Sequence, residues 1–227
     1  MQVEARCESY VNTGPSEAPA TARTGFDGRT PYHVVMSSRT PVSLPYTGNV
    51  EADTLLAADP LALLIGFILD QQVTTIKAFS GPLELRRRAG SLEAGAIAAM
   101  DPADLDALFR RTPALHRFPG TMATRVRSAC AIVAEQYGGD ASRIWTGAAD
   151  AQDLRRRLMD IPGIGTEKAA DIIGVLANGF GIRPAGWQQA MPAEPSLAYV
   201  DSPESMARYL GFKRAAKAVA RKAGTTP

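Results

Sequence analysis

The segment from Leu158 to Leu176, LMDIPGIGTEKAADIIGVL, constrains the fold more than any other part of the chain. Leu158 and Ile161 are three residues apart and share one face at the end of a predicted helix, which Pro162 ends because proline lacks a backbone N–H. After a short turn, a second predicted helix carries an apolar stripe at helical spacing, made of Ala169, Ala170, Ile172, Ile173 and Leu176. The segment therefore predicts two helices that meet at a tight hairpin.

The hairpin between these helices is built on glycine. Gly163 and Gly165 flank Ile164 and supply backbone conformations that are costly for other residues, while the Ile164 side chain can pack between the helices. The second helix begins at Gly165 or Thr166, so several backbone N–H groups at its start have no partner within the helix. A helix N-terminus of this kind binds anions, and Lys168 adds a positive charge one turn later. We therefore predict a phosphate-binding hairpin.

Size and composition favour a globular protein. The 227 residues, of which 45% are hydrophobic, suffice for a substantial core in one large or two small domains. The longest apolar run, residues 61–69, is too short to cross a bilayer before Asp70 interrupts it, and the sequence opens with no cleavable signal pattern. We therefore expect a cytoplasmic protein with no membrane partner.

Cysteine and histidine are too few for the common metal sites. Cys7 and Cys130 are the only cysteines, whereas a cysteine-ligated iron–sulfur cluster needs about four thiolates. His33 and His116 lie far apart and lack the spacing of zinc ligands. We expect no metal site, and we expect Cys130 to act as a small buried hydrophobic residue.

Strand signals are nearly absent, so we expect an all-α fold in three parts. Residues 1–40 are rich in Ser, Thr, Pro and Gly and are predicted to be disordered or an extension outside the fold, and residues 41–200 form a helical domain. Within it, a buried helix follows the Asp59–Pro60 start signal and runs through residue 79, and Thr121 caps a long helix that Gly138 ends. Residues 178–195 read as a loop.

The third part, residues 201–227, is a basic helix or tail. A last helix is predicted from Pro203 to about Lys222. From residue 208 onward the chain has no acidic residue and six basic ones, namely Arg208, Lys213, Arg214, Lys217, Arg221 and Lys222. Such a segment can contact phosphates, although a solvated tail would have the same composition.

The hydrophobic-Pro-Gly-hydrophobic-Gly pattern resembles the helix-hairpin-helix of the DNA-repair glycosylase superfamily that includes endonuclease III and 3-methyladenine DNA glycosylase II. Two further stretches are similar to that superfamily: residues 70–74, a Gln-Gln-Val step after a hydrophobic run, and residues 121–139, the helix before the hairpin unit. The similarity covers residues 45–180. It implies an all-α, glycosylase-like helical bundle that binds double-stranded DNA and needs no cofactor, unless a monovalent cation binds at the hairpin as in the family.

The resemblance also implies roles for individual residues. Gln72 matches the glutamine that enters the duplex near the gap left by an extruded base, because a base must leave the stack before it can be attacked. Its alternative role is to bond loop backbone. The hairpin residues that would hold a phosphate are Gly163, Ile164, Gly165, Thr166 and Lys168. The aromatic candidates for stacking on the extruded base are Trp187 and Tyr46, and Trp187 is favoured by its place in the insertion after the hairpin. We expect Trp145 to pack internally. Arg125 and Arg127 are expected to be solvated.

The catalytic positions are where the chain departs from the superfamily. Members that also cleave the DNA backbone use a lysine two positions after the second hairpin glycine, and Glu167 stands there. Lys168 is about 100° further round the helix and is expected to point elsewhere, so no efficient β-lyase activity is predicted. The essential aspartate of the family is matched best by Asp201 in a Val-Asp step, but Asp201 before Ser202–Pro203 also fits an ordinary helix N-cap.

The resemblance and these features favour a nucleoid-associated, monomeric base excision repair protein. It would be a monofunctional DNA glycosylase that acts on damaged bases, alkylated ones among them, with Asp201 assisting hydrolysis. One alternative is a non-catalytic binder of damaged DNA that keeps the hairpin and Gln72. A second is a helical protein-interaction module in which the hairpin is only a corner, and it predicts no salt-dependent DNA binding.

Overall fold

The computed structural model describes residues 41–222, with side chains through residue 219. All of these residues belong to one compact unit, so residues 201–222 are part of the same unit as residues 41–200. Residues 1–40, which are predicted to be disordered or an extension, lie outside the described residues. The side chains of Arg221 and Lys222 also lie outside them.

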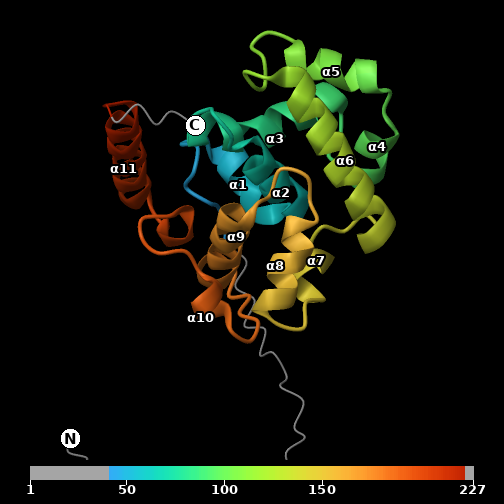
Figure 1. Ribbon diagram of the computed structural model, residues 1–227. Helices are drawn as coiled ribbons and strands as arrows, with labels where there is room; N and C mark the ends of the chain where they lie inside the picture. The colour runs from blue at the N-terminus through green and yellow to red at the C-terminus, as the bar shows by residue number, and fades with distance from the viewer. Residues whose placement is uncertain (1–40, 223–227) are drawn as a thin grey trace, which may run out of the picture. The chain divides into compact units, whose positions relative to one another are not determined.

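The described residues form eleven α-helices and one 3-10 helix and contain no strand, which confirms the all-α class (Figure 1). In chain order the elements are α1 (Val50–Ala58), α2 (Pro60–Leu69), α3 (Thr75–Ala89), α4 (Ala94–Ala99), α5 (Pro102–Arg110), α6 (Pro119–Tyr137), α7 (Arg143–Thr146), α8 (Ala151–Met159), α9 (Thr166–Gly179), α10 (Trp187–Ala190), η1 (Leu197–Tyr199) and α11 (Pro203–Lys222).

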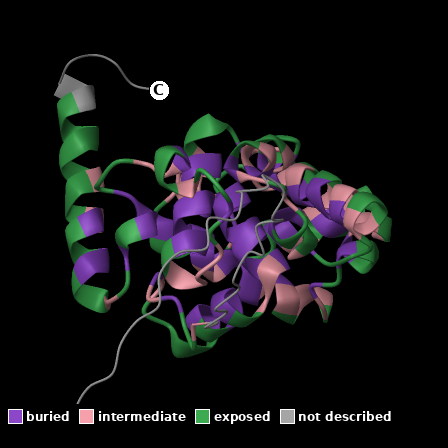
Figure 2. Cartoon of the chain, turned by 90° about the horizontal axis from the view of Figure 1, so that it is seen from below, coloured by how far each residue is buried: buried purple, intermediate pink, exposed green. Residues whose placement is uncertain are grey.

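Helix α2 is the centre of the core, and all of its residues from 61 to 69 are buried. Figure 2 shows the buried residues gathered in the interior of the molecule. The Asp59 carboxylate caps it as predicted, accepting hydrogen bonds from the backbone N–H groups of residues 61 and 62. Helix α3 packs against it at two glycines: a Cβ on Gly66 would lie 2.6 Å from the Phe79 ring, and one on Gly81 would lie 2.5 Å from a Leu69 methyl group. The two helices can approach this closely only because both positions lack a side chain.

The predicted single helix from residue 61 to 79 is wrong, because α2 ends at Leu69 and α3 begins at Thr75. Gln72, in the segment between them, has φ 53°, which no right-handed helix contains. The Thr74 hydroxyl then caps α3 by accepting a hydrogen bond from the Lys77 N–H at 3.2 Å. Polar residues therefore break the helix where it leaves the core.

Of the helices in residues 41–222, none is by itself long and apolar enough to span a membrane. Helices α1 and α2 reach that length and composition only as a pair, and the chain bends by 113° between them.

Helix α6 lies across α4 and α5 and also contacts α2 (Figure 1). The helix begins at Pro119 and not after a Thr121 cap, because a proline at the first helical position has no N–H that needs a partner. It ends at Gly138, as predicted. Arg125 and Arg127 on this helix are not simply solvated: Arg127 donates to the Met100 carbonyl at 3.2 Å, and Arg125 bonds the Gln71 side chain. Helix α6 is thus tied to the segment between α2 and α3.

Helices α8 and α9 form the predicted pair around the hairpin. The whole apolar stripe of α9 is buried, and Ile164 is only 5% exposed between the two helices. Segment 178–195 is not entirely a loop, because residues 187–190 form α10 against α8 and α9. Further on, η1 packs so closely on α9 that a Cβ on Gly174 would lie 2.4 Å from the Ala198 methyl group.

Helix α11 lies apart from the helical core for much of its length (Figures 1 and 2). Its buried residues are Ser205, Met206 and Tyr209, all in the first half, and residues 214–219 are exposed on every side. Its second half is therefore a projecting helix that carries Arg214 and Lys217.

Candidate nucleic-acid interface

The hairpin presents a set of unpaired backbone N–H groups. Gly163 has φ 93° and turns the chain, and the N–H of Ile164 bonds the Ile161 carbonyl at 3.1 Å. Gly165 is the N-cap of α9 and offers no side-chain cap. Within the described chain, the N–H groups of residues 163 and 165–168 donate to no protein acceptor. This is the arrangement that binds a phosphate at a helix N-terminus.

Only one of the two hairpin glycines is required by its backbone conformation. Gly163 lies in the left-handed region, whereas Gly165, with φ −97°, has a conformation open to any residue, contrary to the prediction. A Cβ on Gly165 would meet no atom within 4 Å. The space in front of Gly165 is therefore available to a ligand.

The segment between α2 and α3 lies directly against the hairpin. A Cβ on Gly163 would lie 3.1 Å from Nε2 of Gln71. Gln71 is fixed from three sides: Nε2 donates to the Ile68 carbonyl at 2.7 Å, Oε1 accepts from Arg125, and the backbone carbonyl bonds Nε2 of His116 at 2.8 Å. The preceding helix α2, the distant helix α6 and the loop that carries His116 thus hold Gln71 in place beside the hairpin.

Gln72 follows this anchored residue and is exposed. It is the only non-glycine residue in the described chain with a positive φ. A side-chained residue in this region costs conformational energy, and such strain concentrates at functional sites. Gln72 is therefore an exposed residue with a strained backbone that directly follows Gln71, the residue held against the hairpin.

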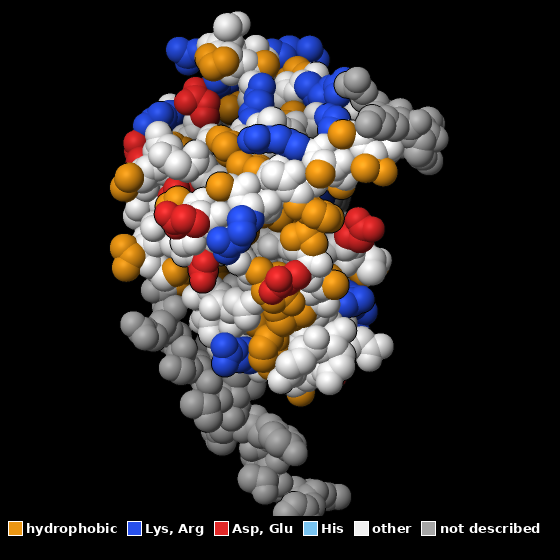
Figure 3. Space-filling model, turned by 90° about the vertical axis from the view of Figure 1, so that its left-hand side faces the viewer, with side chains coloured by type: hydrophobic (Ala, Val, Ile, Leu, Met, Phe, Trp, Pro, Cys, Tyr) orange, Lys and Arg blue, Asp and Glu red, His pale blue; other side chains and the backbone are white. Residues whose placement is uncertain are grey.

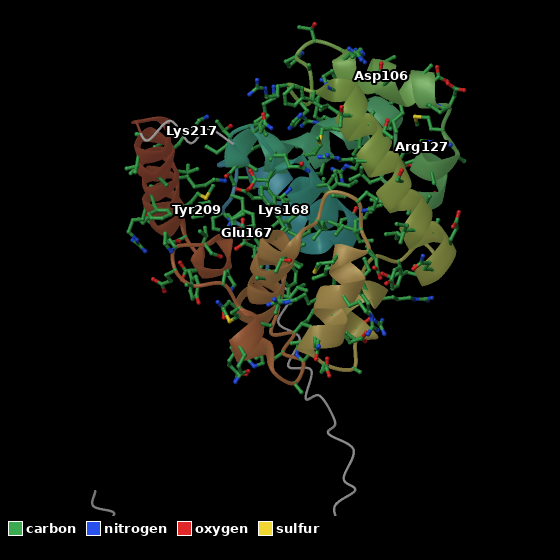
Figure 4. The ribbon with its side chains drawn as sticks, in the orientation of Figure 1. Asp106, Arg127, Glu167, Lys168, Tyr209 and Lys217 are labelled. Carbon is green, nitrogen blue, oxygen red and sulfur yellow. The ribbon has the colours of Figure 1, made fainter. Side chains whose placement is uncertain are left out.

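A cluster of charged side chains lies between the hairpin helix α9, the start of α3 and α11. It consists of Lys168 and Asp171 on α9, Asp70 after α2, and Lys213 on α11. Lys213 Nζ lies 3.4 Å from an Asp70 carboxylate oxygen and donates to Thr75 Oγ1 at 2.9 Å. Figure 4 shows Lys168 at the start of α9 and Tyr209 on the side of α11 that faces α2 and α3, with Asp106 and Arg127 far from both.

Lys168, predicted to assist phosphate binding, turns toward this cluster. Its ammonium donates to the Gly163 carbonyl at 3.2 Å, while Glu167 is exposed. Burial is the largest effect on Lys168 and lowers its pKa to about 8, against the attraction of Asp70. Lys168 therefore closes the hairpin from inside instead of reaching outward to a phosphate.

Asp171 is the half-buried carboxylate of the cluster. Burial raises its pKa, the Ser196 hydroxyl opposes this by hydrogen bonding, and the negative charge of Asp70 raises the pKa further. Asp171 is thus a carboxylate with a raised pKa one turn from the hairpin amides, a combination that is common at catalytic sites.

A groove adjoins the cluster on the side of Gln72. It has a volume of about 460 Å³ and runs between residues 72–76 and one face of α11. Figure 3 looks onto the α11 side of the molecule and shows Lys and Arg side chains gathered in its upper part, with hydrophobic side chains below them. Hairpin, Gln72, charged cluster and groove therefore form one continuous candidate interface.

Asp201 lies outside this cluster. Its carboxylate accepts a hydrogen bond from the Ser205 hydroxyl at 3.0 Å and is exposed. The N-cap of α11 is Ser202, whose hydroxyl and carbonyl accept the N–H groups of residues 205 and 206, so the alternative that Asp201 is the cap is wrong. Pro203 and Lys213 are about 15 Å apart along the helix, which separates Asp201 from the groove.

The two aromatic base-pocket candidates are also not brought to the hairpin. Tyr46 is 1% exposed and packs edge-on against Phe79 at 5.2 Å, so its ring has no free face for a base. Trp187 has the Arg183 guanidinium over its ring at 5.1 Å and sits beside the start of α8, where the Ala151 N–H bonds the Ala185 carbonyl. The hairpin follows the other end of α8, about 13 Å away.

His116 is a residue of the site that sequence reasoning missed. It is 1% exposed, and its Nδ1 accepts the Phe118 N–H at 3.0 Å, so Nε2 carries the proton donated to Gln71. Burial lowers its pKa, the hydrogen bond to the Gln71 carbonyl opposes this, and the charges of Lys77 and Arg117 lower the pKa further. Protonation of Nδ1 would remove the acceptor of the Phe118 N–H and set two N–H groups against each other. The start of α6 would then lose this hydrogen bond.

The free energy of unfolding is therefore expected to fall as the pH drops below about 6.5, the ordinary histidine pKa. The unfolded chain takes up a proton there while folded His116 stays neutral, so protonation favours unfolding. Urea unfolding of wild type and His116→Gln between pH 5 and 8 measures this. The pH dependence should be weaker in the variant; equal dependence in both would show that His116 is not its source.

Comparison with known proteins adds no family assignment. No protein-family model matches the chain, and no curated protein matches it. Within residues 41–222, no group of three or more His, Cys, Asp or Glu side chains could hold a metal ion.

Proposed function

We propose that this chain is a helix-hairpin-helix DNA-binding protein of base excision repair that hydrolyses the N-glycosidic bond of a damaged base in duplex DNA. The observation that carries the proposal is the uncapped N-terminus of α9 with Gln72 held next to it in a left-handed conformation. Open backbone amides suit a phosphate, and a rigidly displayed polar side chain suits the gap that an extruded base leaves.

In this proposal each part of the interface has one task. The amides of residues 163 and 165–168 hold one phosphate of the damaged strand. Gln72 enters the duplex, and its position is maintained by the bonds from Arg125 and His116 to Gln71. The damaged nucleotide leaves the stack on the side of the charged cluster, where its sugar comes near Asp171.

The proposed reaction is hydrolysis. The C1′–N bond breaks with its electron pair going to the base, positive charge develops on the sugar, and water adds its oxygen to C1′ while its proton passes to the base. A carboxylate near the sugar stabilises that charge and orients the water. The geometry favours Asp171 for this role over Asp201, which the resemblance implies, because Asp171 lies in the cluster beside the hairpin.

Neither lyase chemistry nor a bound cation is part of the proposal. The Lys168 amine is occupied at the Gly163 carbonyl, and Glu167 holds the position of the superfamily's lysine nucleophile. A monovalent cation on the hairpin carbonyls does not fit either, because the Lys168 ammonium already contacts the Gly163 carbonyl and would repel it.

A non-catalytic binder of damaged DNA is the second candidate. The resemblance links Asp201 to catalysis, but this carboxylate lies outside the charged cluster, and a protein without a catalytic carboxylate at the site would bind DNA without releasing a base. The two candidates share the DNA interface and differ only in base release.

DNA binding at the hairpin is tested by Gly165→Ala. The added methyl group meets open space, so the fold should be unchanged, but it occupies the place of the phosphate, and we expect about tenfold weaker binding to a short duplex with a smaller salt dependence. Fluorescence anisotropy at several salt concentrations and thermal unfolding measure the two effects.

Two further variants make this test specific. Gly95→Ala also adds a methyl group in open space, on α4, and should bind DNA like wild type. Gly163→Ala should instead lower stability, because a side-chained residue is strained at φ 93° and its Cβ would lie only 3.1 Å from Nε2 of Gln71. Wild-type affinity in Gly165→Ala, or binding without salt dependence, would refute the hairpin interface.

A further inference from the structure

We infer that the groove beside Gln72 receives the extruded base and that its positive charge selects bases that leave as anions, such as uracil, hypoxanthine or 8-oxoguanine, over cationic alkylated bases. This inference rests on the proposed function and deepens it by naming the class of lesion. It departs from the sequence-based expectation that alkylated bases are substrates.

The position and shape of the groove suit an extruded base. Gln72 forms part of its wall, so a base displaced by that side chain would face the groove directly. Its volume of about 460 Å³ lies within the range of roughly 300–1,000 Å³ found for small-molecule pockets. Val73 and Ile76 on one side and Leu210 on the other provide apolar walls for the flat faces of a base.

The charge of the groove is one-sided. Lys213, Arg214 and Lys217 line it, and none of the described residues that line it is acidic. Asp70 offsets Lys213, but among the described residues Arg214 and Lys217 form no ion pair. Figure 4 shows Lys217 on the side of α11 that faces α3. A base in the groove would therefore be held in a positive field.

That field acts differently on the two classes of damaged base. When the glycosidic bond of a neutral base breaks, the electron pair stays on the base nitrogen, and the leaving base carries a negative charge until the proton from water reaches it. Cations beside it stabilise this developing charge. A cationic alkylated base is repelled by the same cations before the reaction and leaves as a neutral molecule, so the groove offers it no stabilisation.

The test compares base release from duplexes of one sequence that carry uracil, hypoxanthine, 8-oxoguanine, 3-methyladenine or 7-methylguanine. Single-turnover rates at saturating protein are divided by the spontaneous rate for each duplex, because cationic bases depart faster without any enzyme. We expect the enhancement for at least one neutral base to exceed that for both cationic bases by tenfold or more. A larger enhancement for a cationic base would overturn the inference.

Lys217→Gln tests the role of the groove itself. It should lower the saturated rate for the neutral base about tenfold and leave any release of cationic bases unchanged. Arg156→Gln removes one exposed positive charge from α8 and serves as the matched control. If Lys217→Gln instead weakens binding of damaged and undamaged duplexes equally and leaves saturated rates unchanged, Lys217 is a backbone contact and the inference fails.

The outcomes also separate this inference from the function on which it rests. Release of cationic bases alone would refute the selection by charge and leave a glycosylase. No release from any duplex, with DNA binding intact, would refute the hydrolytic function and the inference together, and would identify a non-catalytic binder.

Discussion

Asp171→Asn is expected to lower the single-turnover rate of base release at least 100-fold while DNA affinity stays within about twofold of wild type. Asparagine keeps the size of the side chain and a bond to Ser196 but removes the negative charge that would face the sugar. Removing one preorganised electrostatic group from an active site costs on the order of 100- to 1,000-fold in rate. Rates are measured with protein in excess over a duplex that carries the preferred lesion.

Asp201→Asn is the matched comparison, since it changes the same chemical group on an exposed carboxylate outside the charged cluster. It should change the rate by less than about threefold. The reverse result, with release lost in Asp201→Asn and kept in Asp171→Asn, would show that the residue implied by the resemblance carries the chemistry and that our assignment from geometry is wrong.

The pH profile of release gives an independent check on Asp171. Its pKa is raised by burial, so the carboxylate gains a proton at a higher pH than an exposed aspartate would. Because the proposed role needs the charged form, the rate should fall as the pH decreases through this raised pKa. Asp201→Asn should keep that limb of the profile, and the residual rate of Asp171→Asn should lack it.

The hairpin could be predicted from sequence because its signals are local. Proline, two glycines and the apolar stripe of α9 each act within a few residues, and the structure has the turn and the buried stripe where they were expected. The conformation of Gly165 was predicted wrongly because an N-cap and a turn both favour glycine, and only the first applies there. The orientation of Lys168 had a signal that was not used: Lys168 lies four residues before Ile172 and so borders the buried stripe.

The support of Gln72 could not be predicted, because it depends on contacts between distant residues. His116 is 45 residues from Gln71 and Arg125 is 54 residues from it, and no local pattern pairs them. The same reason explains the two aromatic candidates. Composition marks Tyr46 and Trp187 as possible stacking residues, but only the packing of Phe79 and Arg183 against them shows that their rings are engaged elsewhere.

Arg88→Met is expected to lower the free energy of unfolding by about 2 kcal/mol, the scale for losing hydrogen bonds to a charged group whose acceptors remain partly accessible to water. The Arg88 side chain is 3% exposed and pairs with Glu84 at 2.7 Å. Its guanidinium also donates to three backbone carbonyls, those of Leu108, Arg111 and Pro113, at 2.6 to 2.9 Å. Methionine fills similar space but leaves these acceptors and the Glu84 charge without their donor.

Arg87→Met, the adjacent position on α3, separates this network from general effects of charge and helix propensity. Arg87 is 52% exposed and pairs only with Glu51 on the surface, so its loss should cost less than about 1 kcal/mol. Urea unfolding of both variants measures the difference, and equal effects would contradict a special role for Arg88.

Arg88 also holds the chain that leads to His116, and His116 bonds Gln71. Arg88→Met should therefore also weaken DNA binding by Gln72 under conditions where the variant remains folded. Stability of α3 and display of Gln72 would then depend on the same buried guanidinium.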